Sequence, residues 1–290
     1  MKDVQGERDF RNIPINRVGV RNVYYPILVV APSSAEGENV CREQSTVASV
    51  SMSVLLPHEF RGTHMSRFIE TLEKCHGRIS LATLPSIARG LRDRLDAPEA
   101  ALRFDFPYFI RKSAPVSKNE SFMRYEVSLE ASSRGDCSSG EDFDMIIGVG
   151  VPVQTLCPCS REIAEHGAHN QRALISLRIR CAVQGGGTSA GGGAEGARLS
   201  AASGPIWFEE LIRMAEDSAS APLFTLLKRE DEKFVTERAY ENPKFVEDVV
   251  RDLTLRLNAE PRITWYAVSV VSSESIHNHD AFAEIVRDKR

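Results

Sequence analysis

Apolar residues follow two kinds of pattern along this chain. Runs rich in β-branched and apolar residues are typical of strands, and apolar residues three or four positions apart share one face of a helix. In the first half, such runs predict strands at Val23–Val30, Val47–Leu56, Ala100–Phe109 and Phe122–Glu130. Between the second and third of these strands the helical spacing occurs twice, over residues 63–75 and again after Pro85. The predicted order of this half is ββααββ.

The second half repeats that order. Runs of the same kind predict strands at Phe143–Leu156, Arg172–Val183, Ile263–Val271 and Ala281–Val286. Helical spacing occurs over Ile206–Met214, and again over Phe245–Leu257, for which Asn242 is the expected N-cap. Strand pairs that enclose helix pairs predict an α+β fold with antiparallel sheets and helices on one face. We expect two such units, residues 1–140 and residues 141–290.

One segment departs from both patterns. Residues 184–204 read QGGGTSAGGGAEGARLSAASG and offer almost no apolar side chain to bury. Such a composition predicts a flexible surface insertion. Its G-x-G-x-x-G match lacks the helix and the later acidic residue that a dinucleotide-binding fingerprint requires, and the chain contains no G-x-x-x-x-G-K-[ST] segment. Neither of these two phosphate-binding motifs is therefore predicted.

Composition and charge narrow the class of protein. Hydrophobic residues make up 42% of the 290-residue chain and charged residues 26%, which is typical of a globular protein. The formal net charge of −4 excludes a general affinity for nucleic acids, so an anionic ligand needs a local basic site. The N-terminal segment is unlike a signal peptide, no apolar run reaches membrane-spanning length, and the six cysteines are too irregularly spaced for a disulfide scaffold. These features predict a cytoplasmic protein.

The densest group of potential ligands is the segment CPCSREIAEHGAHNQR, which begins at Cys157. If residues 155–159 are extended, Cys157 and Cys159 point to the same face, and a turn at Gly167 brings a later histidine back toward them. A thiolate with an imidazole can bind a divalent metal, and a cysteine beside a histidine can act as a nucleophile. A buried cysteine pair beside two surface histidines, His166 and His169, is the simpler structural alternative.

The C-x-C spacing favours an open metal site over a closed structural one. Structural zinc sites usually contain two ligand pairs, and this chain has no second pair because its other cysteines are single. An open site completed by distant residues leaves a coordination position for water or substrate, which catalysis requires.

Further candidates lie nearer the C-terminus. His277 and His279 are two residues apart, so on an extended segment they share a face and can act as an acid–base pair; in a polar loop they are only solvated. Glu232 lies outside any strong helical pattern, on an expected connecting segment. Glu247 lies within the predicted helix beside apolar residues, which we expect to screen it in part. The pattern alone does not distinguish these two from the neighbouring Glu230, Glu237 and Glu241.

Four segments of the chain resemble the type IB GTP cyclohydrolases, a family of the tunnelling-fold superfamily. They are RGTHMSRFIE (61–70), TLCPCSREIAEHGAHNQR (155–172), DEKFVTERAYENPKFVEDVVRD (231–252) and ESIHNHDAFA (274–283). The resemblance spans nearly the whole chain except residues 184–204. It implies tandem ββααββ tunnelling-fold units that assemble into an oligomeric barrel, expected to be a homotetramer, with sites near subunit interfaces.

The same resemblance implies the roles of the site residues. The metal ligands are Cys157, His169 and Glu232, the purine-binding carboxylate is Glu247, the catalytic histidines are His277 and His279, and Cys159 matches a second active-site cysteine without an assigned role. The implied reaction is hydrolysis of GTP to 7,8-dihydroneopterin triphosphate and formate, the first step of tetrahydrofolate biosynthesis. One divalent metal is expected per site, and zinc, manganese and iron(II) all suit these mixed ligands. Candidates to bind the triphosphate are Arg61, His64, Arg67, Arg172 and Lys228.

Two other functions fit the same residues. A tunnelling-fold nitrile reductase would use Cys157 or Cys159 as a covalent nucleophile, although the second histidine pair and the weak dinucleotide fingerprint count against it. A non-enzymatic, metal-stabilised interaction module would unfold when its metal is removed.

Overall fold

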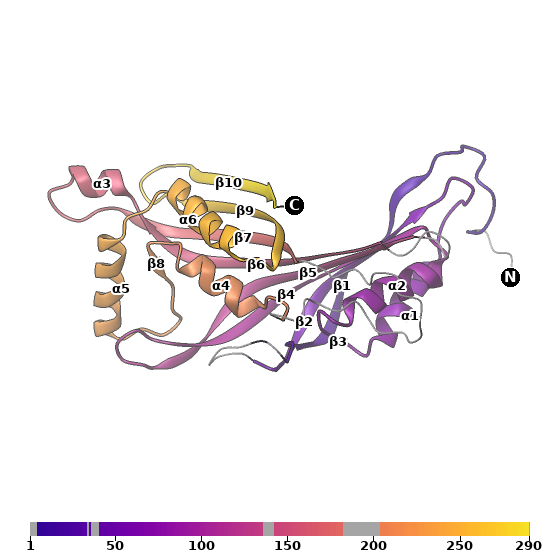
Figure 1. Ribbon diagram of the computed structural model, residues 1–290, viewed down its shortest axis with the longest axis horizontal. Coiled ribbons are helices and arrows are strands. Elements are labelled where there is room, and N and C mark those ends of the chain that lie inside the picture. Colours follow the sequence, from indigo (N-terminus) through magenta and orange to yellow (C-terminus); the bar gives the residue numbers. More distant parts are fainter. Residues whose placement is uncertain (1–4, 34, 36–40, 136–141, 182–203, 290) are drawn as a thin grey trace. The chain divides into compact units, whose positions relative to one another are not determined.

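The computed structural model describes residues 5–33, 35, 41–135, 142–181 and 204–289, which form ten strands and six helices (Figure 1). All eight predicted strands and all four predicted helices are present. The strands are β1 (Ile15–Val30), β2 (Glu43–Leu56), β4 (Glu99–Ser113), β5 (Glu120–Arg134), β6 (Asp142–Leu156), β7 (Asn170–Cys181), β9 (Ile263–Ser273) and β10 (Asp280–Asp288). The helices are α1 (Met65–Lys74), α2 (Leu84–Leu95), α4 (Phe208–Glu216) and α6 (Val246–Ala259). The insertion predicted at residues 184–204 lies outside the described residues except for Gly204.

Four elements were not predicted from the sequence. The strands β3 (Arg78–Ile79) and β8 (Ala221–Pro222) have two residues each, which is too short for an alternating pattern. The helix α3 (Pro158–Ile163) buries none of its residues, so it has no apolar face. The helix α5 (Arg229–Glu241) buries only Asp231 and Ala239, and its charged surface resembles that of a solvated loop.

The predicted architecture of tandem ββααββ tunnelling-fold units, with antiparallel sheets and helices on one face, is wrong. The strands of the described residues form one mixed sheet in the order β10-β9-β7-β6-β5-β4-β2-β1-β3, with β8 paired to β6 and β3 parallel to β1. The second half carries four helices, in contrast to the two of the first half. Apolar patterns show which face of a strand is buried but not which strand lies beside it. The sequence therefore did not reveal that β5 and β6 join the two halves in one sheet-dominated α+β fold.

The chain divides into two compact units that are not continuous in sequence. One contains residues 1–33, 42–107 and 128–147, and the other contains residues 34–41, 108–127 and 148–290. Each of the long strands β4, β5 and β6 contributes residues to both units. The boundary between residues 140 and 141 that the sequence suggests stays a prediction.

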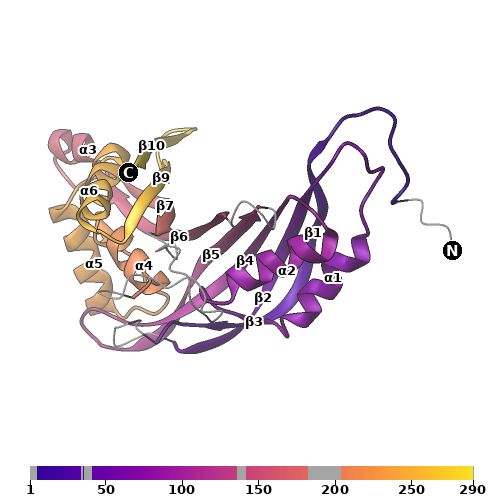
Figure 2. The same ribbon diagram turned by 45° about the vertical axis from the view of Figure 1, so that its right-hand side comes forward.

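In the first unit, α1 packs against both α2 and β1 (Figure 2). Each helix presents a narrow apolar stripe to its neighbours. Phe68 and Leu72 on α1 and Leu84 and Leu91 on α2 are fully buried. A lysine lies in the last turn of α1 and two arginines lie in the last turn of α2, where they stabilise the partial negative charge of the helix C-terminus.

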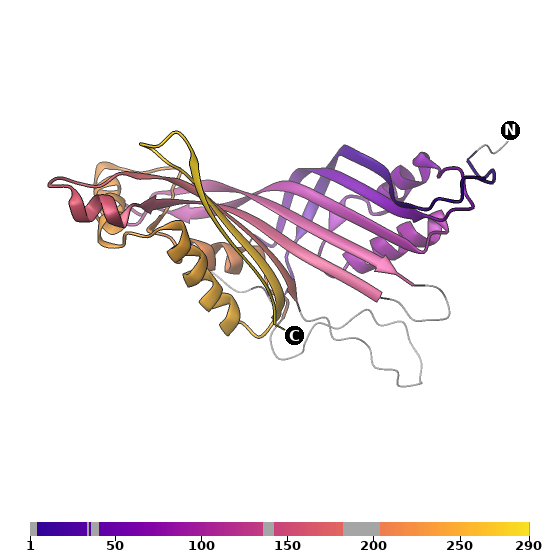
Figure 3. The same cartoon turned by 90° about the horizontal axis from the view of Figure 1, so that it is seen from above.

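In the second unit, α4 and α6 cover one face of the sheet. The helix α6 contacts β9, β10 and α4, and α4 contacts β7 (Figure 3). The contact is made by fully buried apolar side chains, among them Phe208 and Leu211 on α4 and Val249 and Leu253 on α6. Burial of side chains of this size contributes about 1.5–3 kcal/mol each, so this layer holds the second unit together.

Asn242 is not the N-cap of α6. It is the C-cap of α5, and its side-chain amide donates to the carbonyls of Ala219 at 3.0 Å and Ser220 at 3.2 Å. The helix α6 begins after Phe245, whose backbone N–H donates to Asp248 Oδ2 at 3.0 Å. Asn242 therefore ends α5 and does not begin α6. The N-terminus of α6 is capped by Asp248, three residues after Phe245.

The five cysteines that the structure describes are free thiols. None of the helices in the described ranges is long and apolar enough to cross a membrane.

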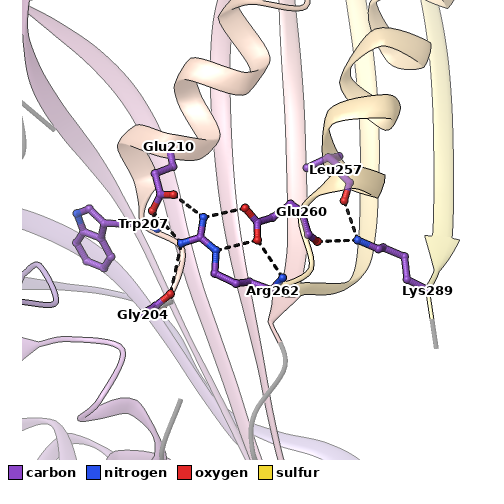
Figure 4. Close-up of polar contacts among 7 residues, drawn as sticks. All are labelled: Gly204, Trp207, Glu210, Leu257, Glu260, Arg262 and Lys289. Carbon is purple, nitrogen blue, oxygen red and sulfur yellow. Dashed lines mark hydrogen bonds and ion pairs between the residues drawn. The ribbon is translucent and has the colours of Figure 1, made fainter. Parts of the chain in front are cut away.

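A charged cluster joins the first turn of α4 to the chain that follows α6 (Figure 4). Arg262 donates to Glu210 at 2.6 Å, to Glu260 at 2.8 Å and to the carbonyl of Gly204 at 3.3 Å. Lys289 donates to the carbonyl of Glu260 at 2.7 Å. The hydrogen bond between Arg262 and Glu260 raises the pKa of Arg262 and lowers the pKa of Glu260. The side chain of Arg262 is only 19% exposed, so solvent screens these charges incompletely.

We expect Arg262→Met to lower the free energy of unfolding by roughly 2–4 kcal/mol, because it leaves two partly buried carboxylates without their shared cation. The pKa of Glu260 is lowered on folding, so its ionised form contributes stability above its unfolded value of about 4.3. That contribution is lost as the pH falls toward the lower folded value. The variant should therefore lose less stability on acidification than the wild type, which urea unfolding at neutral pH and near pH 4 measures.

Arg251→Met is the matched control for this experiment. Arg251 is 69% exposed and pairs with Asp248 at 3.8 Å, so its removal should change stability by less than about 0.5 kcal/mol. Equal effects of the two substitutions would contradict a structural role for the Arg262 cluster.

Candidate functional site

The end of β6 is the meeting point of several distant segments of the second unit. The backbone N–H of Leu156 donates to Ser220 Oγ at 3.2 Å, and its carbonyl accepts from the backbone N–H of Lys244 at 3.0 Å. The next residue, Cys157, donates its backbone N–H to the carbonyl of His169 at 3.1 Å. These bonds place the starts of α3, β7 and α6 around one strand end.

Residues 155–159, whose side chains would alternate if the segment were extended, do not form one extended segment. Pro158 occupies the first turn of α3, where its fixed φ angle suits a helix, so the strand stops at Leu156. Cys157 becomes the N-cap, and its Sγ accepts from the backbone N–H of Ser160 at 3.4 Å. Cys159 lies within the helix and is exposed, so the two thiols do not share a strand face.

The predicted return of the chain toward Cys157 is confirmed. Gly167 has a φ of +73°, in the left-handed region that other residues rarely adopt. After this turn the backbone N–H of His169 donates to Ser160 Oγ at 3.1 Å, in addition to the bond between His169 and Cys157. The loop therefore places a thiol and an imidazole on neighbouring, hydrogen-bonded backbone segments.

A cavity of about 400 Å³ opens beside this strand end. That volume lies within the usual range of small-molecule sites. Five of the residues selected from the sequence line it, namely Cys157, His169, Glu247, His277 and His279. Other residues that line it include Thr155, Gln171, Lys244, Phe245, Glu274 and Phe282.

Cys159, His166 and Glu232 are not among the residues that line this cavity. Glu232 lies on α5 and is exposed, so its expected place on a connecting segment is wrong. The helix contacts the end of β6 through Ala239, which packs with Leu156. Glu232 precedes Ala239 by two turns, or about 10 Å along the helix axis.

The position of α5 is fixed at its other end by a buried carboxylate. Asp231 has no exposed surface, and it accepts hydrogen bonds from the backbone N–H groups of Val116 at 2.8 Å, Ser117 at 2.9 Å and Lys228 at 2.8 Å. The hydroxyl of Ser117 donates a fourth, at 2.6 Å. Burial opposes ionisation of Asp231, but these hydrogen bonds outweigh it and lower its pKa. The first turn of α5, which carries Glu232, is thus held against the loop between β4 and β5.

The two C-terminal histidines lie together in the turn between β9 and β10. The rings of His277 and His279 are stacked, with centroids 5.2 Å apart and an angle of 27° between their planes. The ring of His169 stands edge-on to His277 at 6.3 Å. The segment that carries them is a bend and not an extended strand, and both side chains are exposed where they line the cavity.

Glu247 faces the same cavity from the first turn of α6. The partial screening expected from its apolar neighbours is wrong, because Val246 turns into the core while Glu247 is exposed. An exposed carboxylate at this point can bind a ligand that enters the cavity, and the N-terminus of the helix favours its negative charge.

Four polar residues behind His169 were not selected from the sequence. Gln171 Oε1 lies 3.0 Å from His169 Nδ1, and Gln171 Nε2 donates to Glu274 at 3.2 Å and to Thr155 at 3.4 Å. Thr155 in turn bonds Ser272 at 3.2 Å. The one available signal was the two-residue spacing of His169 and Gln171. Glu274 and Ser272 become neighbours of that pair only because β9 lies beside β7.

Cys157 and His169 suit a divalent metal as a pair of ligands. They offer one sulfur and one imidazole nitrogen to the same cavity, which is the donor chemistry that zinc and similar ions prefer. Within the described ranges, no three His, Cys, Asp or Glu side chains are close enough together to hold a metal ion. The structure therefore brings together two of the three predicted ligands and leaves Glu232 apart from them.

Sequence comparisons identify close relatives of the chain. A family model described as type I GTP cyclohydrolase folE2 matches residues 1–283. A protein of Kosmotoga olearia named GTP cyclohydrolase FolE2 is 44% identical over 289 residues, which cover 100% of this chain and 99% of that protein. A protein of the same name from Thermosipho melanesiensis is 48% identical, with 98% of this chain and 96% of that protein covered.

Structural comparisons show a similar fold at low sequence identity. The crystal structure of a uricase from Bacillus fastidious aligns with a TM-score of 0.56 and 10% identity, covering 95% of this chain and 93% of that one. Urate oxidase from Bacillus sp. TB-90 aligns with a TM-score of 0.52 and 8% identity, covering 94% and 100%. These similarities concern the fold alone and agree with a sheet-dominated α+β architecture.

We expect Gly167→Ala to lower the free energy of unfolding by about 1–2 kcal/mol, because an alanine at a positive φ is strained even where space is available. The matched control is Gly90→Ala in α2, where an added methyl group also meets nothing within 4 Å but the backbone is helical. That control should raise stability by about 0.5–1 kcal/mol. Urea unfolding measures both, and a Gly167→Ala protein as stable as the wild type would contradict the strained turn.

Proposed function

The chain belongs to the type I GTP cyclohydrolase FolE2 family, and we propose that the cavity at the end of β6 is where it hydrolyses GTP. It is a GTP cyclohydrolase of folate biosynthesis, an enzyme that converts GTP to 7,8-dihydroneopterin triphosphate and formate. Membership of this family leaves the nitrile reductase and the non-enzymatic module without support.

One observation carries the location of the site. Five residues selected from the sequence, spread over more than 120 positions of the chain, line a single cavity: Cys157, His169, Glu247, His277 and His279. They bring a thiol, three imidazoles and a carboxylate to one opening. Ring opening of a purine requires attack by water and several proton transfers, and these groups are suited to both.

A divalent metal held by Cys157, His169 and Glu232 is the proposed source of the nucleophile. Such an ion acts as a Lewis acid and makes water a stronger nucleophile near neutral pH. The shared cavity of Cys157 and His169 supports the first two ligands. Glu232 is proposed as the third ligand from the family resemblance, and metal occupancy of Glu232→Ala tests it. Cys159 is proposed as a second active-site thiol on the same basis.

Glu247 is the proposed guanine-binding residue. A carboxylate can accept two parallel hydrogen bonds, from guanine N1–H and from the exocyclic amine, and adenine does not offer this pair of donors. Glu247 is exposed at the cavity before a ligand enters, so it is available to make these contacts.

His277 and His279 are the proposed proton carriers. Imidazole is the side chain whose ordinary pKa lies closest to neutrality, so it can both donate and accept a proton under the same conditions. The stacked rings reach the cavity next to the ring of His169. From there they can protonate purine nitrogens and the ribose oxygen as the ring opens and rearranges.

We also propose that the chain acts as a homo-oligomer, with a homotetramer as the expected form. The edge strand β10 carries two strongly exposed apolar side chains, Phe282 at 70% and Val286 at 67%, and Phe282 also lines the cavity. A second copy could cover these residues. The cytoplasmic location expected from the sequence stays a prediction.

The direct test of the function is incubation of the purified protein with GTP and a divalent metal. We expect a fluorescent pterin after oxidation of the product, together with one formate per GTP consumed. Hydrolysis of GTP without formate would show that the purine ring stays closed and would contradict the proposed reaction at this site.

For the metal, we expect Cys157→Ala, His169→Ala and Glu232→Ala each to lower bound zinc or manganese and to abolish turnover, because an open site has only three protein ligands. Elemental analysis after dialysis against a weak chelator measures occupancy. Exposed Glu237→Ala, on the same helix as Glu232, is the control and should retain metal. A Glu232→Ala protein with full metal content would remove Glu232 from the ligand set.

For the histidine pair, we expect His277→Ala and His279→Ala to retain metal but to lose turnover by roughly a hundredfold or more, the usual contribution of a general acid or base. His166→Ala is the control, since His166 is exposed and does not line the cavity. Loss of metal from either variant would identify these residues as ligands and not as proton carriers.

For substrate choice, we expect Glu247→Ala to bind metal normally and to lose GTP turnover by several orders of magnitude. ITP lacks the exocyclic amine, so its turnover should fall less than that of GTP. Steady-state kinetics of both nucleotides on the wild type and the variant measure the difference. A variant that kept the wild-type preference for GTP over ITP would remove Glu247 from the guanine site.

A further inference from the structure

A chain of side-chain hydrogen bonds ends on the ring of His169. Gln171 lies between Glu274 on one side and His169 on the other, with contacts of 3.2 Å and 3.0 Å. A second contact of 3.4 Å joins the Gln171 amide to Thr155. Thr155 is 1% exposed, and the side chains of His169 and Glu274 are each 12% exposed. The network is therefore largely removed from water, where the direction of each hydrogen bond matters most.

The carboxylate of Glu274 sets the direction of these bonds. An ionised carboxylate only accepts hydrogen bonds, so the Gln171 group 3.2 Å from it must be the amide nitrogen. The amide oxygen of Gln171 then faces His169 Nδ1 at 3.0 Å. The opposite orientation of the amide would place its oxygen against the Glu274 carboxylate, and two acceptors cannot form a hydrogen bond.

An amide oxygen has no hydrogen to donate, so the bond to His169 exists only if Nδ1 carries the proton. In a neutral imidazole one nitrogen is protonated and the other has the free electron pair. The free pair is then on Nε2, on the opposite side of the ring from Gln171. The second oxygen of Glu274, 3.9 Å from Nδ1, adds an electrostatic preference for the proton at this position.

We propose that Gln171 and Glu274 are positioning residues that hold neutral His169 in the Nδ1–H tautomer and present Nε2 to the cavity. The tautomer itself follows from the hydrogen bonds of this chain, whereas its use in metal binding rests on the proposed function. A ligand histidine that already has the correct tautomer and ring orientation binds a metal more tightly than one that must select them. Glu274 fixes the orientation of the Gln171 amide, and the amide oxygen of Gln171 in turn fixes the tautomer of His169.

The test begins with the protein free of metal. Histidines labelled with ¹⁵N are observed by long-range ¹H–¹⁵N NMR at alkaline pH, where imidazole is neutral, and His169 is assigned by its absence from His169→Gln. We expect a single Nδ1–H tautomer in the wild type. Gln171→Leu removes the acceptor and should give a mixture of tautomers. Glu274→Gln frees the Gln171 amide to turn over and should also give a mixture while preserving the size of the side chain.

Zinc affinity, measured by competition with a chromophoric chelator, is the second readout. We expect Gln171→Leu to weaken binding by about 10–100-fold and Glu274→Gln by about tenfold, the usual effect of losing a partner of a ligand histidine. Two substitutions of the same chemistry are the controls. Gln154→Leu removes an amide that donates to Asn170, and Glu284→Gln removes an exposed carboxylate on β10. Both controls should change zinc affinity by less than about twofold.

The readouts separate this proposal from the proposed function. A wild-type protein with the proton on Nε2, or a Gln171→Leu protein with the wild-type tautomer and zinc affinity, would overturn the positioning role. Failure of the wild type to bind zinc would contradict the proposed metal site. The tautomer spectra are recorded without metal, so they would still support or overturn the positioning role. If Gln171→Leu acted only by destabilising the fold, urea unfolding would show the loss of stability. Glu274→Gln is a nearly isosteric change and tests the same pair of hydrogen bonds without that effect.

Discussion

The site depends on the hydrogen bonding of two residues at the end of β6. Leu156 is 3% exposed, so its backbone N–H and carbonyl cannot rely on water, and an unpaired group there would cost about 1–3 kcal/mol. Ser220 and Lys244 satisfy these two groups, and His169 accepts from the next N–H, of Cys157. Three segments that are distant in the sequence are thereby held at one strand end. The segments around His169 and Lys244 line the cavity together with the end of β9, the turn that follows it and the start of β10.

Buried charge fixes the position of the helices around this strand end more specifically than apolar contacts do. Apolar burial between α6 and the sheet contributes most of the stability, but it tolerates small shifts because it has no direction. The four hydrogen bonds of Asp231 and the forked contacts of Arg262 are directional, and either set is lost if its helix moves by one residue. Glu247 lines the cavity at the start of α6, whereas Glu232, next to Asp231 on α5, is exposed and is not among the residues that line it.

Much of the local structure followed from the sequence, with errors that have identifiable causes. Long strands and helices with an apolar stripe were correctly predicted because their periodicity reports a buried face. The helix α5 was missed because it buries only Asp231 and Ala239. Asn242 was assigned to the wrong helix end because its amide bonds Ala219 and Ser220, which only the folded chain brings near it. The ββααββ repeat failed as an architecture because strand pairing joins both halves in one sheet.

The sequence by itself determined the chemistry of this protein. The thiol, imidazole and carboxylate groups, the glycine turn before His169 and the spacing of His277 and His279 can all be read from the chain, since residue type and short-range geometry are local properties. Only the tertiary structure decided which of these groups share a cavity and what lies behind them. Gln171 and Glu274 are 103 residues apart, and no local pattern reports a contact made by the pairing of β7 with β9.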